Sequence, residues 1–394
     1  MRSFRKASGM SLLFAILTGL IGQDPSNEMP SPEAGSEQVS EVIRTFGGRG
    51  TLADDTPPTP AREAVGEFQT RKGFAVELMA SEPEVRQPLF LSWDSRGRLW
   101  VSQYLQYQFP AGLKIIEYDN HLRAQFDKVP EPPPHGVKGA DKITVFEDLD
   151  GDGFFDRSKD VVTGLNVSTA VVTGHGGIWV ANPPYLLFYP DKDQDDVPDS
   201  DPEVRLSGFG LEDTHSVMNS LQWGPDGWLY ATHGRTNWSM IGKPGTPTES
   251  RVRFDGGVWR YHPTNHHWEA VADGTTNPWG IDWNDYGDAF ICNCVNPHLF
   301  HVIPGAHYEP WRGRKSSQYA FQRIDTIADH LHYVGLGNVR SGLGSHPQRR
   351  ALCCGGQPSL WWHRRLGPDV VGFAGSTRRK NTGQPNSGID PAAS

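Results

Sequence analysis

The sequence contains little cysteine, no long apolar run and no excess of basic residues. Only 4 of its 394 residues are cysteine, and no C-x-x-C-H motif is present, so covalent haem attachment is not encoded. The apolar stretch at residues 11–21 is shorter than the ~20 residues of a membrane-spanning helix, which argues against a stable membrane span. The net charge of -9 argues against nucleic acid as a partner. Few stretches keep a helical period, which disfavours a helical bundle.

Glycine, proline and aromatic residues are abundant instead. The chain has 44 Gly, 31 Pro, 13 Trp and 18 Phe, the composition of a turn-rich β protein. One pattern, an apolar strand followed by a glycine turn and an aromatic residue, occurs at residues 91–101, 172–180, 221–231 and 281–291. Alignment of the four copies pairs Gly97, Gly176, Gly227 and Gly287, and then Trp100, Trp179, Tyr230 and Phe290. Each copy predicts a two-stranded hairpin.

A second repeat, in step with the first, is an acidic loop between two apolar strands. Its copies cover residues 144–165 and 186–209, and the equivalent residues Phe146 and Phe188 lie 42 positions apart. Repeats of this length, made of short strands, are typical of propeller blades. We therefore predict an all-β fold, a six-bladed β-propeller that is either complete or incomplete at its C-terminal end. An ordinary β-sandwich with turns at similar spacing is the alternative.

The acidic loops place several carboxylates within one short turn, as calcium sites do. Four aspartates of the first loop are candidate ligands: Asp148, Asp150, Asp152 and Asp156. The second loop offers Asp191, Asp193, Asp195 and Asp199, with Asp196 in place of the turn glycine Gly153. Oxygen atoms at this spacing favour Ca²⁺, and we expect the ion to have a structural role. The alternative is a pair of solvated acidic turns.

The two ends of the chain differ from its middle. Residues 1–23 combine a basic start with a short apolar run, which predicts a signal peptide and export to the periplasm or the extracellular space; an uncleaved N-terminal anchor is the lesser alternative. Residues 24–66 are rich in Pro, Ser and Glu and read as a disordered linker. The propeller is expected over residues 67–344. Residues 345–394 form an irregular basic stretch, which we interpret as either a disordered tail or a shifted reading frame.

Several motifs in order along the chain carry a family resemblance. They read PLFLSWDSRGRLWV, DLDGDGFFD, DTHSVMNSLQWGPDGWLY, GTTNPWGIDW, HVIPGAHYE and IADHLHYVG. Over residues 68–344 the chain resembles the N-terminal propeller of proteins designated membrane-bound dehydrogenases of planctomycete-type bacteria. That group is similar in turn to the soluble quinoprotein glucose and sorbosone dehydrogenases. The resemblance implies a six-bladed propeller, export, and use of pyrroloquinoline quinone.

The resemblance transfers catalytic residues in part. Quinoprotein sugar dehydrogenases have a proton-accepting His before a G-P-D hairpin, and His215 lies in the matching place; imidazole suits this role because its pKa is near working pH. Asn277 matches a quinone-contacting Asn, but Thr276 replaces the Arg before it. Arg235 is the candidate substitute cation for an anionic quinone. No orienting acid is evident after the hairpin, where residues 231–235 read ATHGR.

Two functions from different classes follow. The first is an exported oxidoreductase, a dehydrogenase dependent on pyrroloquinoline quinone that acts on a sugar or related alcohol and passes electrons to an external acceptor. The second is a calcium-stabilised propeller without chemistry, which serves as a binding or scaffold module. A group of histidines, His298, His301, His307, His330 and His332, is open to two interpretations as well: a transition-metal pair at the last two, or hydrogen-bonded histidines on loops.

Overall fold

The computed structural model describes residues 59–68, 75–105, 111, 114–118, 122–125, 130–294, 299–308, 324, 340–344, 351–355, 360–363 and 371–374. The expected signal peptide and most of the expected linker lie outside these residues. Within the described part of the chain, no helix has the length and apolar character needed to cross a membrane.

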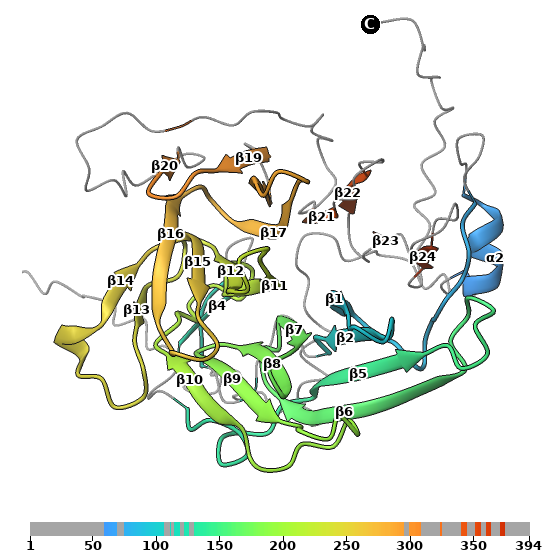
Figure 1. Ribbon diagram of the computed structural model, residues 1–394, viewed down its shortest axis with the longest axis horizontal. Helices are drawn as coiled ribbons and strands as arrows, with labels where there is room; N and C mark the ends of the chain where they lie inside the picture. The colour runs from blue at the N-terminus through green and yellow to red at the C-terminus, as the bar shows by residue number, and fades with distance from the viewer. Residues whose placement is uncertain are drawn as a thin grey trace, which may run out of the picture. The chain divides into compact units, whose positions relative to one another are not determined.

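Four antiparallel sheets follow one another along the chain (Figure 1). The first sheet pairs β1 (Pro88–Trp93), β2 (Leu99–Gln103), β5 (Asp141–Glu147) and β6 (Arg157–Leu165) in that order. The second pairs β7 (Ala170–Thr173), β8 (Gly177–Asn182), β9 (Tyr185–Pro190) and β10 (Glu203–Ser207). The third contains β11 (Asn219–Trp223), β12 (Leu229–His233), β15 (Gly257–Tyr261) and β16 (Trp268–Gly274), with β20 (His307–Tyr308) added in parallel. The fourth contains β17 (Pro278–Trp283), β18 (Ala289–Asn293) and β19 (Leu299–Val302).

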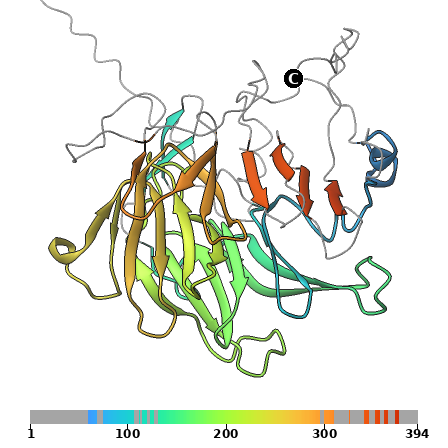
Figure 2. The ribbon, with the colours of Figure 1, turned by 45° about the horizontal axis from the view of Figure 1, so that its top comes forward.

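Smaller elements complete the described chain. Four two-stranded ribbons are β3 (Lys114–Tyr118) with β4 (Leu122–Gln125), β13 (Ser239–Ile241) with β14 (Val252–Phe254), β21 (Arg340–Gly344) with β22 (Ala351–Gly355), and β23 (Leu360–His363) with β24 (Val371–Ala374). The helices are α2 (Ala61–Gly66) and the single 3₁₀ turn η2 (Thr248–Ser250). The β13–β14 ribbon extends from the third sheet in both views (Figure 1, Figure 2). Helix α2 falls inside the expected linker, and β22, β23 and β24 fall inside the expected irregular tail.

The first strands of successive sheets are neighbours, which defines a propeller. Strand β1 contacts β7, β7 contacts β11, β11 contacts β17, and β17 contacts β21. Within a sheet the strands follow from this inner strand outward, in chain order. The protein is therefore an all-β propeller, as predicted. The described residues contain four sheets of three or more strands, which is consistent with the expected six-bladed propeller being incomplete.

The four sequence repeats are the inner hairpins of the four sheets. Each repeat supplies the first two strands, and its glycine occupies the turn between them with a positive φ: Gly97 (77°), Gly176 (78°), Gly227 (79°) and Gly287 (84°). A side chain would strain this left-handed conformation, which explains why glycine recurs there. Three of the paired aromatic residues, Trp100, Trp179 and Tyr230, are buried on the second strand, whereas Phe290 is half-buried.

The core lies between adjacent sheets. Trp179 of the second sheet packs on Tyr261 of the third, with ring centroids 5.7 Å apart, and Tyr230 of the third packs on Trp283 of the fourth at 5.0 Å. Val180 and Leu187 of the second sheet meet Ile143 of the first. Burying each such side chain contributes about 1.5–3 kcal/mol. These contacts hold the sheets face to face, so that loops entering the inner strands come together at one end.

Candidate active site

His215 and Asn277, which are 62 positions apart in the sequence, are hydrogen-bonded in the structure. His215 lies in the connection from β10 to β11, and Asn277 lies in the connection from β16 to β17, so both precede an inner strand. The side-chain amide of Asn277 donates to the main-chain oxygen of His215 over 2.9 Å. The indole of Trp279 donates to the same oxygen (3.1 Å) and to Oδ1 of Asn277 (2.9 Å). The backbone at His215 is thus fixed by Asn277, just before the fourth sheet, and by Trp279 in its first strand.

A buried carboxylate orients the His215 ring. Oδ1 of Asp213 accepts from the His215 backbone N–H (3.0 Å) and lies 3.1 Å from ring atom Nδ1. Both residues are buried, with 4% of Asp213 and 8% of His215 exposed. An ionised carboxylate only accepts hydrogen bonds, so Nδ1 carries the hydrogen in this contact and Nε2 is the basic atom. Asp213 and His215 therefore form a carboxylate–imidazole dyad.

Asp213 is in turn held by the segment after β12. Its Oδ2 accepts from the hydroxyl of Thr236 over 2.7 Å. Asn237 bonds both backbone groups of Asp213: Oδ1 accepts from its N–H (2.7 Å) and Nδ2 donates to its C=O (2.9 Å). An orienting acid was expected only after the hairpin, so Asp213 was not predicted, although the D-x-H spacing in residues 213–215 is a signal that the sequence offers.

Gly234 permits the close packing of these segments. A Cβ at this position would lie 2.0 Å from Oγ of Ser216 and 2.7 Å from Oδ1 of Asn277, distances that no side chain tolerates. The Gly234 N–H also donates to the main-chain oxygen of Ser216 over 3.0 Å. Any side chain at residue 234 would push the end of β12 away from His215.

Arg235 is attached to the Asn277 segment through its backbone. Its N–H donates to the carbonyl of Thr276 over 3.0 Å, and the Cα of Arg235 faces Gly256 closely enough that a Cβ there would lie 3.0 Å away. Arg235 is half-buried. The structure thus brings the stretches that carry His215, Arg235 and Asn277 into hydrogen-bonding contact with one another.

A second, fully buried histidine supports the same loop. His233, the last residue of β12, has its Nε2 at 2.7 Å from Oγ of Ser239, and that oxygen also accepts from the N–H of Gly210 (2.8 Å). The ring packs between Phe209 and Phe254. Burial lowers the pKa of His233 from 6.5 to about 3, because the apolar surroundings disfavour the charged imidazolium. His233 is therefore a neutral structural residue.

The first acidic loop gathers three of its four predicted ligands. Carboxylate oxygens of Asp148, Asp150 and Asp156 lie within 4.8 Å of one another, whereas Asp152 is outside this group. Oδ1 and Oδ2 of Asp148 accept from the N–H groups of Gly151 (2.6 Å) and Gly153 (3.0 Å), which curls the loop around the carboxylate. Such a set of hard oxygen atoms suits Ca²⁺.

The second acidic loop has the same backbone shape without its glycines. Asp191, Asp193 and Asp195 bring carboxylate oxygens within 4.8 Å of one another, and Asp199 is outside this group. Gln194 (φ 59°) and Asp196 (φ 65°) take the left-handed conformation that Gly151 and Gly153 take in the first loop. Burial raises the pKa of Asp191 above its usual value.

Arg98 explains why Asp196 replaces glycine. Its guanidinium binds both carboxylate oxygens of Asp196 (2.5 and 2.9 Å) and donates to Asp94 (2.8 Å). All three side chains are at least nine-tenths buried. This ion-pair cluster ties the second acidic loop to the β1–β2 hairpin, and the bidentate geometry gives it direction as well as strength.

The histidine group does not converge among the described residues. His307 bonds to Asp273 through Nδ1, and His301 stacks on Phe290. Neither belongs to a metal-competent cluster in the part of the chain that is described. The other three members, His298, His330 and His332, lie outside the described residues.

One family model matches most of the chain. Residues 60–348 match the family described as "Domain of unknown function (DUF7133)", and the chain belongs to this family. No curated protein matches the chain.

Three solved structures show distant similarity to the chain. A Thermus thermophilus protein provisionally assigned as an oxidoreductase (glucose dehydrogenase) is 15% identical, with 70% of this chain and 84% of that chain covered and a TM-score of 0.32. Virginiamycin B lyase of Staphylococcus aureus is 15% identical over 55% of this chain and 66% of its own, with a TM-score of 0.26. A Bacteroides fragilis protein provisionally assigned as a 6-phosphogluconolactonase is 15% identical over 56% of each chain, with a TM-score of 0.28. These similarities concern the fold and not the activity.

Proposed function

We propose that this protein is an exported oxidoreductase that dehydrogenates a sugar or related alcohol, with His215 as the base. The observation that carries the proposal is the buried dyad of Asp213 and His215, hydrogen-bonded through its backbone to Asn277. Oxidation of an alcohol removes a proton from oxygen and a hydride from carbon. Nε2 of His215 takes the proton, and Asp213 stabilises the resulting imidazolium and holds the ring in orientation.

The hydride acceptor that the family resemblance suggests is pyrroloquinoline quinone, which accepts two electrons as a hydride when bound. Arg235 would hold a carboxylate of this cofactor, because a guanidinium pairs with carboxylates in a bidentate manner. Asn277 fits less well: its Oδ1 accepts from Trp279 and its Nδ2 donates to His215, so it has one amide hydrogen to offer a ligand. Its main role is then to position His215. We propose further that the electrons then pass from the reduced cofactor to an external acceptor.

Calcium is proposed as a structural ion at the two acidic loops. The first loop offers Asp148, Asp150 and Asp156, and the second offers Asp191, Asp193 and Asp195. Both loops connect outer strands of their sheets, whereas His215 precedes an inner strand, so the ion supplies no chemistry to the dyad in this proposal.

The alternative function is a calcium-stabilised propeller that serves as a binding or scaffold module. The engaged amide of Asn277 favours it, since a residue used to fix backbone is less available to a cofactor. In this case the dyad is a structural hydrogen bond.

Reconstitution separates the two functions. Purified protein is loaded with pyrroloquinoline quinone and Ca²⁺, and reduction of a dye is followed with a panel of sugars. We expect turnover in the wild type and its loss in His215→Ala, with unchanged circular dichroism and melting temperature. If the folded wild-type protein reduces no dye with any of the sugars, the dehydrogenase function is rejected and the scaffold function is retained. N-terminal sequencing of the mature protein tests export independently.

A further inference from the structure

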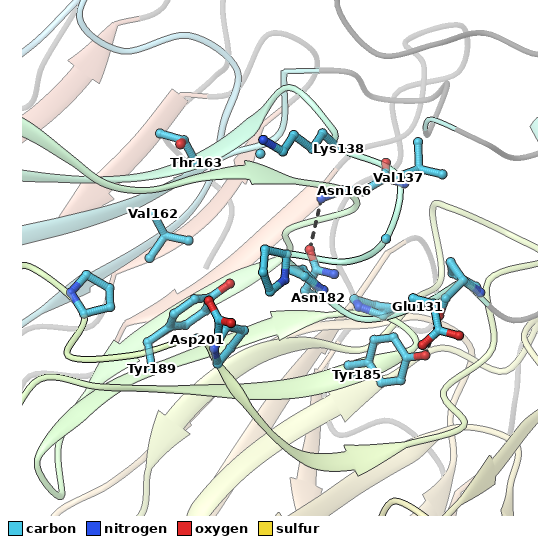
Figure 3. Close-up of a pocket in the computed structure, with 18 of the residues that line it drawn as sticks. Glu131, Val137, Lys138, Val162, Thr163, Asn166, Asn182, Tyr185, Tyr189 and Asp201 are labelled. Atoms are coloured by element: carbon cyan, nitrogen blue, oxygen red, sulfur yellow. Dashed lines mark hydrogen bonds between the residues drawn. The ribbon is translucent and has the colours of Figure 1, made fainter.

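One cavity in the described chain does not include the dyad. A pocket of about 300 Å³ lies between the first two sheets, bounded by β6, by the β8–β9 turn, by β9 and the connection that follows it, and by residues 130–138 (Figure 3). None of its lining residues belongs to the His215 site. This volume is at the lower end of small-molecule sites. The inter-sheet pocket is therefore a separate candidate site.

Two buried polar side chains face this pocket with hydrogen-bonding capacity to spare. Asn182 is 4% exposed; its Oδ1 accepts from the N–H of Asn166 (3.1 Å), and no described group accepts from its amide hydrogens. Tyr189 is 5% exposed, and its hydroxyl forms no hydrogen bond with any described residue. Both residues line the pocket, so their free hydrogens can be donated to a ligand there that accepts hydrogen bonds.

The Tyr189 hydroxyl is a neutral donor. Burial raises the pKa of this phenol strongly, and the charge of Asp201 adds to the effect. The phenol therefore keeps its proton at any physiological pH. A ligand in the pocket meets an O–H group here, next to an exposed carboxylate (Figure 3).

The remaining lining defines the charge and shape of the occupant. The lining carries two carboxylates, Asp201 after β9 and Glu131 in residues 130–138, together with the ammonium group of Lys138. Neither sign of charge therefore dominates the pocket. Proline rings from both walls, with the face of Tyr189, supply rigid apolar surface. An organic anion would face two carboxylates, while a simple cation would leave the amide of Asn182 and the Tyr189 hydroxyl without an acceptor.

We propose that the inter-sheet pocket binds a neutral polyhydroxylated ligand, a mono- or disaccharide or similar polyol. Each hydroxyl both donates and accepts, so one small ring can donate to Asp201 and accept from Tyr189 and Asn182. The C–H faces of such a ring pack on the prolines. This binding requires no redox chemistry and stands independently of the function proposed for His215.

Binding to the full chain tests the assignment, in the His215→Ala background so that turnover plays no part. D-glucose, D-galactose and cellobiose are the probes, with methylammonium and acetate as ionic comparisons, and saturation-transfer NMR and calorimetry as readouts. Tyr189→Phe removes only the hydroxyl, and Asp201→Asn changes an exposed side chain. Tyr286→Phe, at a turn where 91% of the residue is exposed, makes the same chemical change elsewhere.

We expect at least one of the three saccharides to bind. Its affinity should fall about tenfold in Tyr189→Phe and in Asp201→Asn, the effect of one hydrogen bond to a buried or charged group, and stay unchanged in Tyr286→Phe. Three results overturn the proposal: no saccharide binds at tens of millimolar, only an ionic probe binds, or saccharide affinity is the same in all variants.

Discussion

His215 illustrates how a single side chain acquires a role from residues that are distant in sequence. Its ring is oriented by Asp213, and its backbone oxygen is held by Asn277 and Trp279. The sequence predicted His215 and Asn277 from their motifs, but not that Asn277 would bond the backbone at His215. It could not do so because that contact depends on the packing of the third and fourth sheets. Asp213, by contrast, could have been predicted from the sequence, because it lies two residues before the histidine.

Asp213→Asn should impair the base without unfolding the protein. The amide preserves shape but can no longer stabilise an imidazolium, so we expect kcat of the reconstituted enzyme to fall by about 100-fold or more. Melting temperature should change little. The matched control is Asp255→Asn, which removes a carboxylate paired with Arg253 at the surface. Equal activity in the two variants would contradict the proposed dyad.

His233 makes stability depend on pH. Its pKa is about 3 in the folded protein and 6.5 ordinarily, so below about pH 6.5 the unfolded chain binds a proton that the folded protein excludes. Stability is therefore lost as pH falls, by at most about 1.4 kcal/mol per pH unit for this one group.

His233→Gln removes this titration. The variant is expected to be less stable than the wild type at neutral pH, and the gap in unfolding free energy should narrow between about pH 7 and pH 5. Urea unfolding at several pH values measures it. A gap that is constant with pH would mean that His233 is not held neutral by burial.

At the scale of elements, the two acidic loops share a backbone shape that the sequence indicated only in part. Glycine marks the left-handed positions in the first loop, and the D-x-D-x-D repeat predicted both turns. The second loop reaches the same shape with Gln194 and Asp196, because Arg98 from another hairpin holds Asp196. No local pattern reveals a partner that lies 98 residues away.

Calcium binding should distinguish the aspartates of the first loop. Asp150→Ala removes one of the three converging carboxylates, whereas Asp152→Ala removes one outside the group. Calorimetric titration should find two sites in the wild type, one in Asp150→Ala and two in Asp152→Ala. Chelation should lower the melting temperature of the wild type, since an ion present at 100 times its Kd stabilises the folded state by about 2.7 kcal/mol. If chelator does not change the melting temperature and the titration detects no binding, the acidic loops are not calcium sites.

Arg98 should contribute far more to the free energy of unfolding than its neighbour Arg96. Arg98→Met leaves the carboxylates of Asp94 and Asp196 buried without their guanidinium, and we expect a loss of about 3–5 kcal/mol of unfolding free energy. Arg96 also reaches Asp196, but its side chain is 46% exposed, so Arg96→Met should cost about 1 kcal/mol or less. Denaturant unfolding compares them; similar losses would show that burial does not set the strength of this cluster.

At the scale of the whole molecule, the hairpin and loop repeats predicted the propeller because each blade is a local unit with its own strand, turn and aromatic residue. The number of blades was harder to predict. It depends on how the sheets pack around the inner strands, and outer strands such as β20 join a sheet from far along the chain. A six-bladed propeller, either complete or incomplete at its C-terminal end, was expected, and the described residues contain four sheets of three or more strands, which an incomplete propeller allows.

The hydrogen bonds from Asn277 and Trp279 to His215 cross from one blade to the next. The position of His215, the proposed proton acceptor, therefore depends on how closely the third and fourth sheets pack against each other. Mild denaturant, or a ligand that wedges the third and fourth sheets apart, would displace the imidazole before any strand melts. The proposed dehydrogenase activity should then be lost before the β-structure, so that an inactive protein would keep the circular dichroism spectrum of the folded state.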